Sequence, residues 1–429
     1  MRTWLALVPG MATLAVGALA VACAASDDEA NVPDTPRNET IIPDAATTES
    51  DGDASLDADA SGSPCSTDGW CRTVLPDADL VLVDIWTFPA RAFAIAQSPT
   101  LGVKVLEWRE ADATWGYIDD STQNEYGLGA YAGAIWAPSE DEVYYGVAPG
   151  YVYHGTRPTP GAAWTWTRQQ LGDNGRPGML DGWEHGYHAG SRFLALGVWG
   201  ASKSDVYAWF KNTIYRRSSD GGPSEWVPEY VADDFDDENE HLFFTSGAGA
   251  GPGDVWFSGS RTRYSSACAI LVRKTAGGYA RLADGTISDT ECTPRAEIPM
   301  VGGAVGRLTD LQSIGGGKLI ALKGARDLIK VATSGAGYDL DVAAAPGSSI
   351  GLTDAERFLS LWSGPDAVWL TTNGLVIRGA DPWAGGAYEI SSIALRGSPI
   401  TRDIHRVRGT SQTNLWAIGD RIALHKTAP

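Results

Sequence analysis

The chain has 429 residues and a formal net charge of -20, with 51 Gly, 17 Trp and 15 Tyr. Nucleic acid is excluded as a partner, because an acidic chain lacks the clustered Lys and Arg that bind a phosphate backbone. The abundant Gly and aromatic residues, with few helical stretches, predict an all-β protein of short strands and tight turns.

The N-terminus is typical of a signal peptide over residues 1–22, with Arg2 followed by an apolar stretch over 4–22. The sequence Ala20-Val21-Ala22-Cys23 resembles the lipobox of bacterial lipoproteins, although Leu is usual at the position of Ala20. This resemblance implies that Cys23 is lipidated. The alternative is ordinary secretion, with cleavage between Ala22 and Ala25.

An acidic stretch follows over residues 24–64, with 11 Asp/Glu, a single basic residue (Arg37) and no aromatic residue. Such a composition cannot bury enough apolar surface to offset the entropy of ordering, so we expect a disordered linker. The predicted domains are therefore a signal peptide (1–22), a lipidated Cys with an acidic linker (23–64) and a folded domain (65–429).

Four cysteines belong to the folded domain: Cys65, Cys71, Cys268 and Cys292. An even number in an exported protein favours two disulfides, for which three connectivities are possible. Proximity in sequence favours Cys65–Cys71 and Cys268–Cys292.

A repeat organises the folded domain. The stretch Gly197–Phe210 has an apolar strand, Trp199, a short polar turn, the triplet Asp205-Val206-Tyr207 and a second apolar strand. Seven copies align on the residue that ends each triplet. These are Phe93, Tyr144, Tyr207, Trp256, Ile320, Trp369 and Trp416. Repeats of this period without helical periodicity predict a seven-bladed β-propeller with four strands per blade, A (inner) to D (outer).

The last repeat ends after two strands beyond its inner one, so it lacks strand D. The segment 69–76 precedes the first inner strand and has no blade of its own. We therefore expect it to pair with 421–426 and close the ring, which removes exposed sheet edges.

The longest connections are predicted to be D-to-A, whereas A-to-B and C-to-D links are expected to be tight. The D-to-A segments are 119–130, 172–192, 232–241, 283–307, 342–357 and 392–403. Because D-to-A and B-to-C connections share one face of a propeller, that face should carry the binding function. Cys268 and Cys292 fall on the same face, which supports their pairing.

The repeats resemble those of secreted bacterial β-propeller lipoproteins of the myxobacterial type, whose pattern is WGxSxxDVWAVG. The matching stretches include 199–207, 249–259 and 409–420. The segment 218–226 approximates the Asp-box hairpin of a wider propeller superfamily, with one residue too many before Trp226. The resemblance implies the fold and export to the cell envelope. It implies no activity, because propellers host many functions.

The loop over 181–192 is the candidate ligand-binding site. Trp183 and Tyr187 can stack on a sugar or peptide, and the polar side chains can ligate a metal or contribute to binding: Asp181, Glu184, His185, His188 and, at the end of the loop, Arg192. No third ligand accompanies the two His, so neither a metal nor a cofactor is predicted. Loop packing alone is the structural alternative.

Two further acidic features have structural explanations. The Asp of the triplet (Asp205, Asp254) is expected to accept backbone N–H bonds in a turn, with the adjacent aromatic packed between blades. The run 51–62 lacks the Gly and closing Glu of a calcium loop. The run 233–240 is expected to be a solvated acidic rim, with a cation site as the alternative.

These observations favour a lipid-anchored, monomeric binding module of the cell envelope (outer membrane or cell surface) whose partner is a protein or glycan. The lipid anchor is the expected link to a membrane. One alternative is a sialidase-like glycosidase, with loop arginines (Arg176, Arg192, Arg295, Arg307, Arg402) near Glu184 and Tyr187. Another is an envelope scaffold protein.

Overall fold

The computed structural model divides the chain into two units, Met1–Ala60 and Ser61–Pro429. It describes residues 65–125, 131–175, 195–218, 224–251, 253–264, 266–288, 291–295, 298–302, 305–334, 337–344, 350, 357–364, 367–380, 387–395 and 398–428. The predicted signal peptide, Cys23 and the acidic linker lie outside these ranges. Within them, no helix has the length and apolarity needed to cross a membrane.

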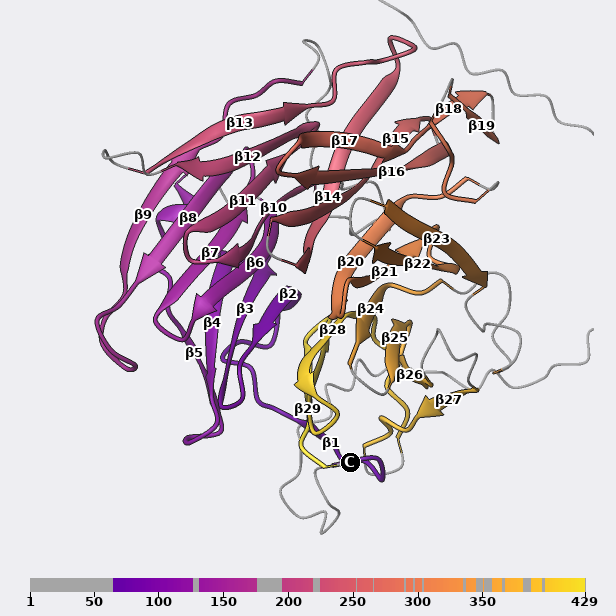
Figure 1. The fold of residues 1–429 in the computed structure, drawn as a ribbon. Coiled ribbons are helices and arrows are strands. Elements are labelled where there is room, and N and C mark those ends of the chain that lie inside the picture. Colours follow the sequence, from indigo (N-terminus) through magenta and orange to yellow (C-terminus); the bar gives the residue numbers. More distant parts are fainter. Residues whose placement is uncertain are drawn as a thin grey trace, which may run out of the picture. The chain divides into compact units, whose positions relative to one another are not determined.

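Seven four-stranded antiparallel sheets form the second unit, which is a β-propeller as predicted (Figure 1). Blade one holds β2 (Val81–Thr87), β3 (Arg91–Ser98), β4 (Gly102–Arg109) and β5 (Thr114–Tyr117). Blade two holds β6 (Ala132–Ser139), β7 (Glu142–Val147), β8 (Tyr151–Thr156) and β9 (Thr165–Gln170). Blade three holds β10 (Leu196–Ser202), β11 (Asp205–Phe210), β12 (Thr213–Ser218) and β13 (Glu225–Val231).

The remaining blades follow the same plan. Blade four holds β14 (Glu240–Gly251), β15 (Asp254–Arg263), β16 (Ser266–Thr275) and β17 (Gly278–Ala283). Blade five holds β20 (Leu308–Gly315), β21 (Lys318–Lys323), β22 (Asp327–Ser334) and β23 (Gly337–Ala344). Blade six holds β24 (Ser360–Ser363), β25 (Val368–Thr372), β26 (Leu375–Gly379) and β27 (Tyr388–Ser391). Blade seven holds β28 (Ile404–Ser411), β29 (Asn414–Gly419), β30 (Ile422–Lys426) and β1 (Trp70–Arg72).

The ring closes through β1, as the sequence predicts. Trp70 pairs with Lys426 in an antiparallel register. Its indole is fully buried and donates a hydrogen bond from Nε1 to Ser391 Oγ at 3.0 Å. The disulfide Cys65–Cys71 forms beside this strand. The last blade is therefore built from both ends of the domain.

The hydrophobic core lies between neighbouring blades. One cluster joins blades one and two, and another joins blade seven to blade one through Trp416 and Trp108, whose ring centroids are 5.3 Å apart. Inner and second strands are apolar on both faces because each face packs on a neighbouring blade. The outer strand β9 is largely exposed.

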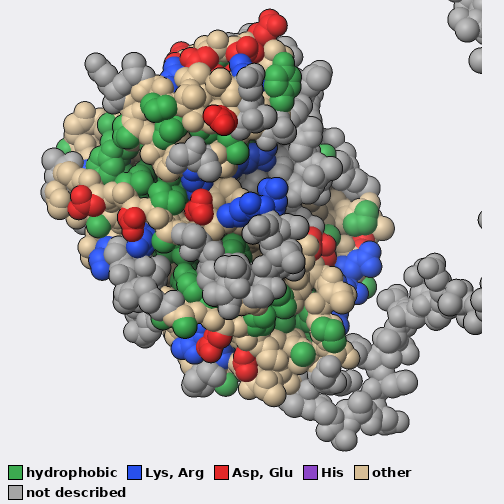
Figure 2. All heavy atoms as spheres, turned by 90° about the vertical axis from the view of Figure 1, so that its right-hand side faces the viewer, with side chains coloured by type: hydrophobic (Ala, Val, Ile, Leu, Met, Phe, Trp, Pro, Cys, Tyr) green, Lys and Arg blue, Asp and Glu red, His purple; other side chains and the backbone are tan. Residues whose placement is uncertain are grey.

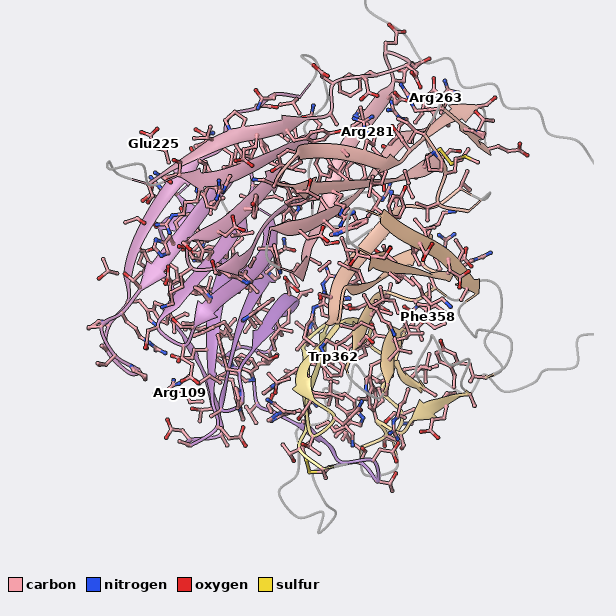
Figure 3. The ribbon with its side chains drawn as sticks, in the orientation of Figure 1. Arg109, Glu225, Arg263, Arg281, Phe358 and Trp362 are labelled. Atoms are coloured by element: carbon pink, nitrogen blue, oxygen red, sulfur yellow. A yellow bond between two sulfur atoms is a disulfide. The ribbon has the colours of Figure 1, made fainter. Side chains whose placement is uncertain are left out.

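The predicted loop lengths hold for D-to-A and A-to-B connections but not for all C-to-D links. The segments 157–164 and 380–387 separate strands C and D in blades two and six, so the prediction that these links are tight is wrong there. The disulfide Cys268–Cys292 is confirmed. It joins β16 to a small hairpin, β18 (Gly285–Ser288) and β19 (Glu291–Pro294), in the upper right of Figure 3.

The repeated acidic residue has a different partner from the one predicted. In blade four, Asp254 accepts hydrogen bonds from the Trp256 indole at 2.8 Å and from Arg273 Nε at 2.7 Å. Arg273 lies opposite Trp256 on strand C. Among the described residues, the partners of this carboxylate are therefore side chains. We call this arrangement of acid, aromatic residue and strand-C partner the clamp.

Variants of the clamp recur around the ring. Blade two uses Glu142, Tyr144 and His154, with the two rings stacked 4.2 Å apart. In blade one the charges are exchanged, because Arg91 occupies the acidic position and Glu107 lies on strand C, 2.5 Å away. The clamp therefore explains the repeated motif as a structural device in several of the blades.

Candidate functional site

A cavity of about 850 Å³ occupies the centre of the ring. Its lining residues come from the inner strands β2, β6, β10, β14, β20, β24 and β28, from some of the turns that follow them and, in blade three, from Asp205 and Trp209 of β11. In most blades they lie in the half of the strand that leads to the A-to-B turn, such as Trp199–Ser202 in β10. The cavity therefore lies toward the face with short turns, whereas the sequence analysis expected binding at the D-to-A face.

One inner-strand position defines the cavity wall. It is the residue that pairs across the hairpin with the aromatic or apolar residue ending each triplet. In chain order, the seven residues are Trp86, Trp136, Trp199, Ala248, Gln312, Trp362 and Arg408. Four blades thus have Trp, and the other three differ from them and from one another. We call this position the wall position.

The Trp residues at the wall position pack on the next blade. The indole of Trp199 lies against Gly249 of blade four, where a Cβ atom would be 3.0 Å from its ring. Trp362 is labelled in Figure 3 and joins the core cluster that contains Val407 of β28. Trp86, Trp199 and Trp362 all line the cavity. Their rings supply apolar surface at three points of its wall.

Four charged side chains form another part of the wall. Asp84, Asp310 and Arg406 lie two residues before the wall position of blades one, five and seven, and Arg408 is the wall residue of blade seven. Asp310 receives hydrogen bonds from Arg406 Nη1 at 2.9 Å and from Arg408 Nη2 at 2.6 Å. The Nε atom of Arg406 is also 3.4 Å from Asp84 Oδ1. Blades one, five and seven therefore meet in a cluster of two carboxylates and two guanidinium groups, which we call the inner charge cluster.

Backbone geometry explains how Asp310 reaches both arginines. Its φ is 52°, in the left-handed region, and the register of β20 shifts between Thr309 and Gln312. A non-glycine residue in this conformation costs roughly 1–3 kcal/mol and is held by its surroundings. Here the surroundings include the N–H of Leu361, which donates to Asp310 Oδ2 at 3.1 Å. Asp310 is thus a strained residue in the central cavity.

Within the inner charge cluster, Asp310 and Arg408 stabilise each other's charged forms. Burial disfavours the charge of Asp310, but Arg406 and Arg408 outweigh it and lower the pKa of this carboxyl group. Burial likewise disfavours the charge of Arg408, yet Asp310 and Asp84 raise its pKa. Each carboxylate also accepts a backbone hydrogen bond from the next blade, as Asp84 does from Ile135 N at 3.0 Å. The charges are therefore mutually compensated.

The candidate site predicted over 181–192 lies outside the described residues, and so does Arg176. The three other loop arginines of the glycosidase hypothesis do not share a partner. Arg295 pairs with Asp236, Arg307 lies 5.6 Å from the Phe243 ring and Arg402 donates to the carbonyl oxygen of Arg421. The glycosidase hypothesis requires several arginines to converge on one carboxylate, and these contacts of Arg295, Arg307 and Arg402 give it no support.

The acidic run 233–240 is exposed over most of its length, as predicted, but it also forms ion pairs and its last residue is buried. Glu240 is buried and lies 2.5 Å from Arg261 Nη1, and Asp284 lies 2.9 Å from Arg261 Nη2. Asp234 and Asp236 bind the arginines of blade four, including Arg281, which Figure 3 labels. The run is therefore a partly buried ion-pair network. Within the described ranges, no group of three metal-binding side chains is found.

Figure 2 shows the charge distribution on one face of the molecule. Acidic side chains gather at its upper end, and basic side chains lie near its middle. Charged groups of both signs are thus interspersed on this face of a strongly acidic chain.

Comparisons with known proteins identify the fold. No protein-family model matches the chain, and no curated protein matches it. Among solved structures, YCF48 bound to D1 peptide has a TM-score of 0.53 and 12% identity, covering 84% of this chain and 97% of that chain. YCF48 from Cyanidioschyzon merolae has the same TM-score and identity and covers 84% of this chain and 99% of its own. At this identity the likeness shows the propeller fold alone.

An ulvan lyase, described as a polysaccharide lyase, is a more distant neighbour. Its TM-score is 0.47 at 9% identity, and the alignment covers 83% of this chain and 94% of that chain. No functional argument rests on this match.

Proposed function

We propose that this protein is a non-catalytic binding module that holds a protein segment or a glycan in its central cavity. The observation that carries the proposal is the composition of the wall. Three indoles and an internally compensated charge cluster surround about 850 Å³. Sites for small ligands have this size and combine apolar surface with a few fixed polar groups. The fold also supports the proposal, because YCF48 is a propeller solved with a bound peptide.

The proposal extends to where the protein acts. The two disulfides indicate an oxidising compartment. With the lipobox-like sequence at Cys23, they support a monomeric, lipid-anchored lipoprotein of the cell envelope. The loop 181–192 stays a predicted second contribution to binding on the D-to-A face.

Binding is tested by calorimetry of the full-length protein against a panel of oligosaccharides and peptides. We expect Trp199→Ala to raise the Kd of the ligand at least tenfold, because it removes an indole from the wall. Tyr264→Ala is the control, since Tyr264 is 66% exposed at a B-to-C turn and lies outside the cavity. Binding that Tyr264→Ala abolishes and Trp199→Ala leaves unchanged would place the site on the D-to-A face and contradict the proposal.

A glycosidase is the second candidate, and the presence of Asp84 and Asp310 in one cavity favours it. It ranks below binding because a general acid needs a raised pKa, whereas arginines lower the pKa of Asp310. Turnover of aryl glycosides that Asp84→Asn abolishes would reverse this ranking. The envelope-scaffold hypothesis stays a prediction.

A further inference from the structure

The inner charge cluster is neutral in total but presents its positive half to the cavity. The side chains of Arg408 and Arg406 are 19% and 12% exposed, whereas those of Asp84 and Asp310 are 9% and 2% exposed. All four residues line the cavity. A ligand that reaches this part of the wall therefore meets guanidinium groups before it meets carboxylates.

Arg406 also has spare hydrogen-bonding capacity. Its Nε atom is buried and has no hydrogen-bond partner among the described residues. Its distance of 3.4 Å from Asp84 Oδ1 gives an ion pair without a hydrogen bond. Arg408, by contrast, donates to Ser360, to two backbone carbonyl groups and to Asp310. A further acceptor in the cavity, above all a carboxylate, would complete the coordination of Arg406.

The rest of the wall suits a ring-shaped ligand with an apolar face. Trp86 and Trp199 are partly exposed, and the inner strand of blade four, against which Trp199 packs, has only small side chains over Ser246–Gly251. Indole rings bind apolar faces such as the C–H face of a pyranose, while hydroxyl and carbonyl groups bind its polar edge. The wall thus offers both kinds of contact that a sugar needs.

An extended peptide fits this wall less well. Peptides that bind a sheet edge need a regular row of unpaired backbone groups. The inner strands that line the cavity are interrupted instead, because β6, β14, β20 and β28 each contain two register shifts. Bulges bend a strand and break the ladder. The cavity therefore lacks a continuous edge on these strands.

From these observations we propose that the ligand of the central cavity is an acidic saccharide. Its carboxylate binds the guanidinium group of Arg406 beside the positive charge of Arg408, and its sugar rings stack on the indoles of Trp86 and Trp199. This inference rests on the proposed binding function and specifies its ligand class.

The test uses the full-length protein and calorimetry with oligogalacturonides and with the same oligosaccharides after methyl esterification. Esterification removes the charge and keeps the sugar rings. Hyaluronan oligosaccharides and sialyllactose extend the acidic set, and an oligoglutamate peptide represents acidic protein segments. We expect at least one acidic saccharide to bind, with a Kd that rises with salt. Its neutral form should bind at least tenfold more weakly.

Variants of the wall sharpen the test. Arg406→Gln and Arg408→Gln should each raise the Kd about tenfold to hundredfold, the loss expected for a charged hydrogen bond. Arg406→Lys, which keeps the charge, should retain part of the affinity. Arg378→Gln is the matched control, because Arg378 pairs with Glu389 on the outer strands of blade six. Circular dichroism checks that every variant is folded.

The outcomes distinguish a failure of the acidic-saccharide inference from a failure of the proposed binding function. If a methyl-esterified saccharide or the oligoglutamate peptide binds best, and Trp199→Ala weakens it, the acidic-saccharide inference is wrong and the binding function stands. If no acidic saccharide binds, the inference is likewise overturned. If Trp199→Ala leaves the binding of every ligand unchanged, the proposed function fails as well.

Discussion

The clamps and the inner charge cluster are both built from charged and aromatic side chains on neighbouring strands, yet they differ in one respect. The clamp joins strands B and C of one blade and returns, with changes, in several blades. The inner charge cluster joins blades one, five and seven and lies in the central cavity. Side chains that recur with the repeat serve the blade. Those that depart from the repeat are where a specific function can reside.

This comparison predicts that clamp variants change stability and leave ligand binding intact, whereas variants of the partly exposed wall residues Trp199 and Arg406 change binding. The buried Asp310 of the inner charge cluster is expected to affect stability as well.

The largest loss of stability is expected in blade seven, where Asn414, Trp416 and His425 form a clamp with an amide in place of the acid, and Asn414 Oδ1 lies 2.9 Å from His425 Nε2. Trp416 is buried, stacks on His425 at 4.1 Å and packs between Trp108 and Trp115 of blade one. Trp416→Ala should lower the free energy of unfolding by about 3–5 kcal/mol.

Chemical denaturation measures this loss, and Trp226→Ala on the outer strand β13 serves as the control. A loss below about 1 kcal/mol would show that the clamp residue is not an important stabilising contact. If the folded Trp416→Ala variant binds the ligand more weakly, the distinction between clamp residues that stabilise the fold and wall residues that bind the ligand is wrong.

The second effect concerns Asp310. Asp310→Asn keeps the shape of the side chain but leaves two arginines without their shared charge, so we expect a loss of about 2–4 kcal/mol. The loss should also depend on pH. Because the folded-state pKa of Asp310 is lowered, its contribution is present above the pKa of an ordinary Asp and is lost as pH falls through the folded-state value.

Urea unfolding of the wild type and Asp310→Asn, at neutral pH and at pH 3, measures both effects. The difference between the two proteins should shrink at the lower pH. A difference that is the same at both pH values would show that the charge of Asp310 does not stabilise the fold.

A smaller loss of stability, which also decreases as pH falls, is expected in the clamp of blade two. Burial opposes the charge of Glu142, but hydrogen bonds from His154 and Tyr144 and the nearby charges of His154 and Lys203 lower its pKa to about 2. Glu142→Gln should therefore cost about 1–3 kcal/mol near neutral pH. This stabilisation is lost as pH falls from the ordinary value of 4.5 toward 2. Thermal melts of the wild type and Glu142→Gln between pH 6 and pH 2.5 test this prediction. The same dependence of Tm on pH in both proteins would contradict it.

The smallest effect is expected from Asp254→Asn. The Asp254 side chain is 18% exposed, and an amide still accepts the hydrogen bond from Trp256. The loss of its ion pair with Arg273 should cost about 1 kcal/mol or less. Thermal unfolding in low and high salt measures the change. A cost that is unaffected by salt would argue that hydrogen-bond geometry, and not charge, holds this clamp.

The sequence alone predicts the seven blades, the closing strand and both disulfides, because each follows from periodicity or from counting. It does not place the site. The arginines of the inner charge cluster belong to the strand over 404–409, where they looked like ordinary parts of an inner strand. The signal was nevertheless present. At the position where four blades have Trp, blade seven has Arg408 and blade five has Gln312.

Two predictions were incomplete because contacts between distant segments are not visible in a repeat. Asp254 faces Arg273 only because strands B and C pair in one particular register. The run 233–240 becomes partly buried because Arg261 and Arg281, both from blade four, reach it. From its composition the run is expected to be solvated, whereas in the fold Arg261 and Arg281 pair with Asp234.

The closure of the ring by β1 has a topological consequence. Residues 70 and 426 pair in one sheet, so the ring of blades is closed by hydrogen bonds. Between strands C and D of blade seven, however, no covalent link joins the two strands. The link 157–164 connects the corresponding strands of blade two. A circular permutant that joins residue 428 to residue 65 and begins at residue 162 would move that interruption to blade two. It should fold to the same ring, with β9 in the role that β1 has now.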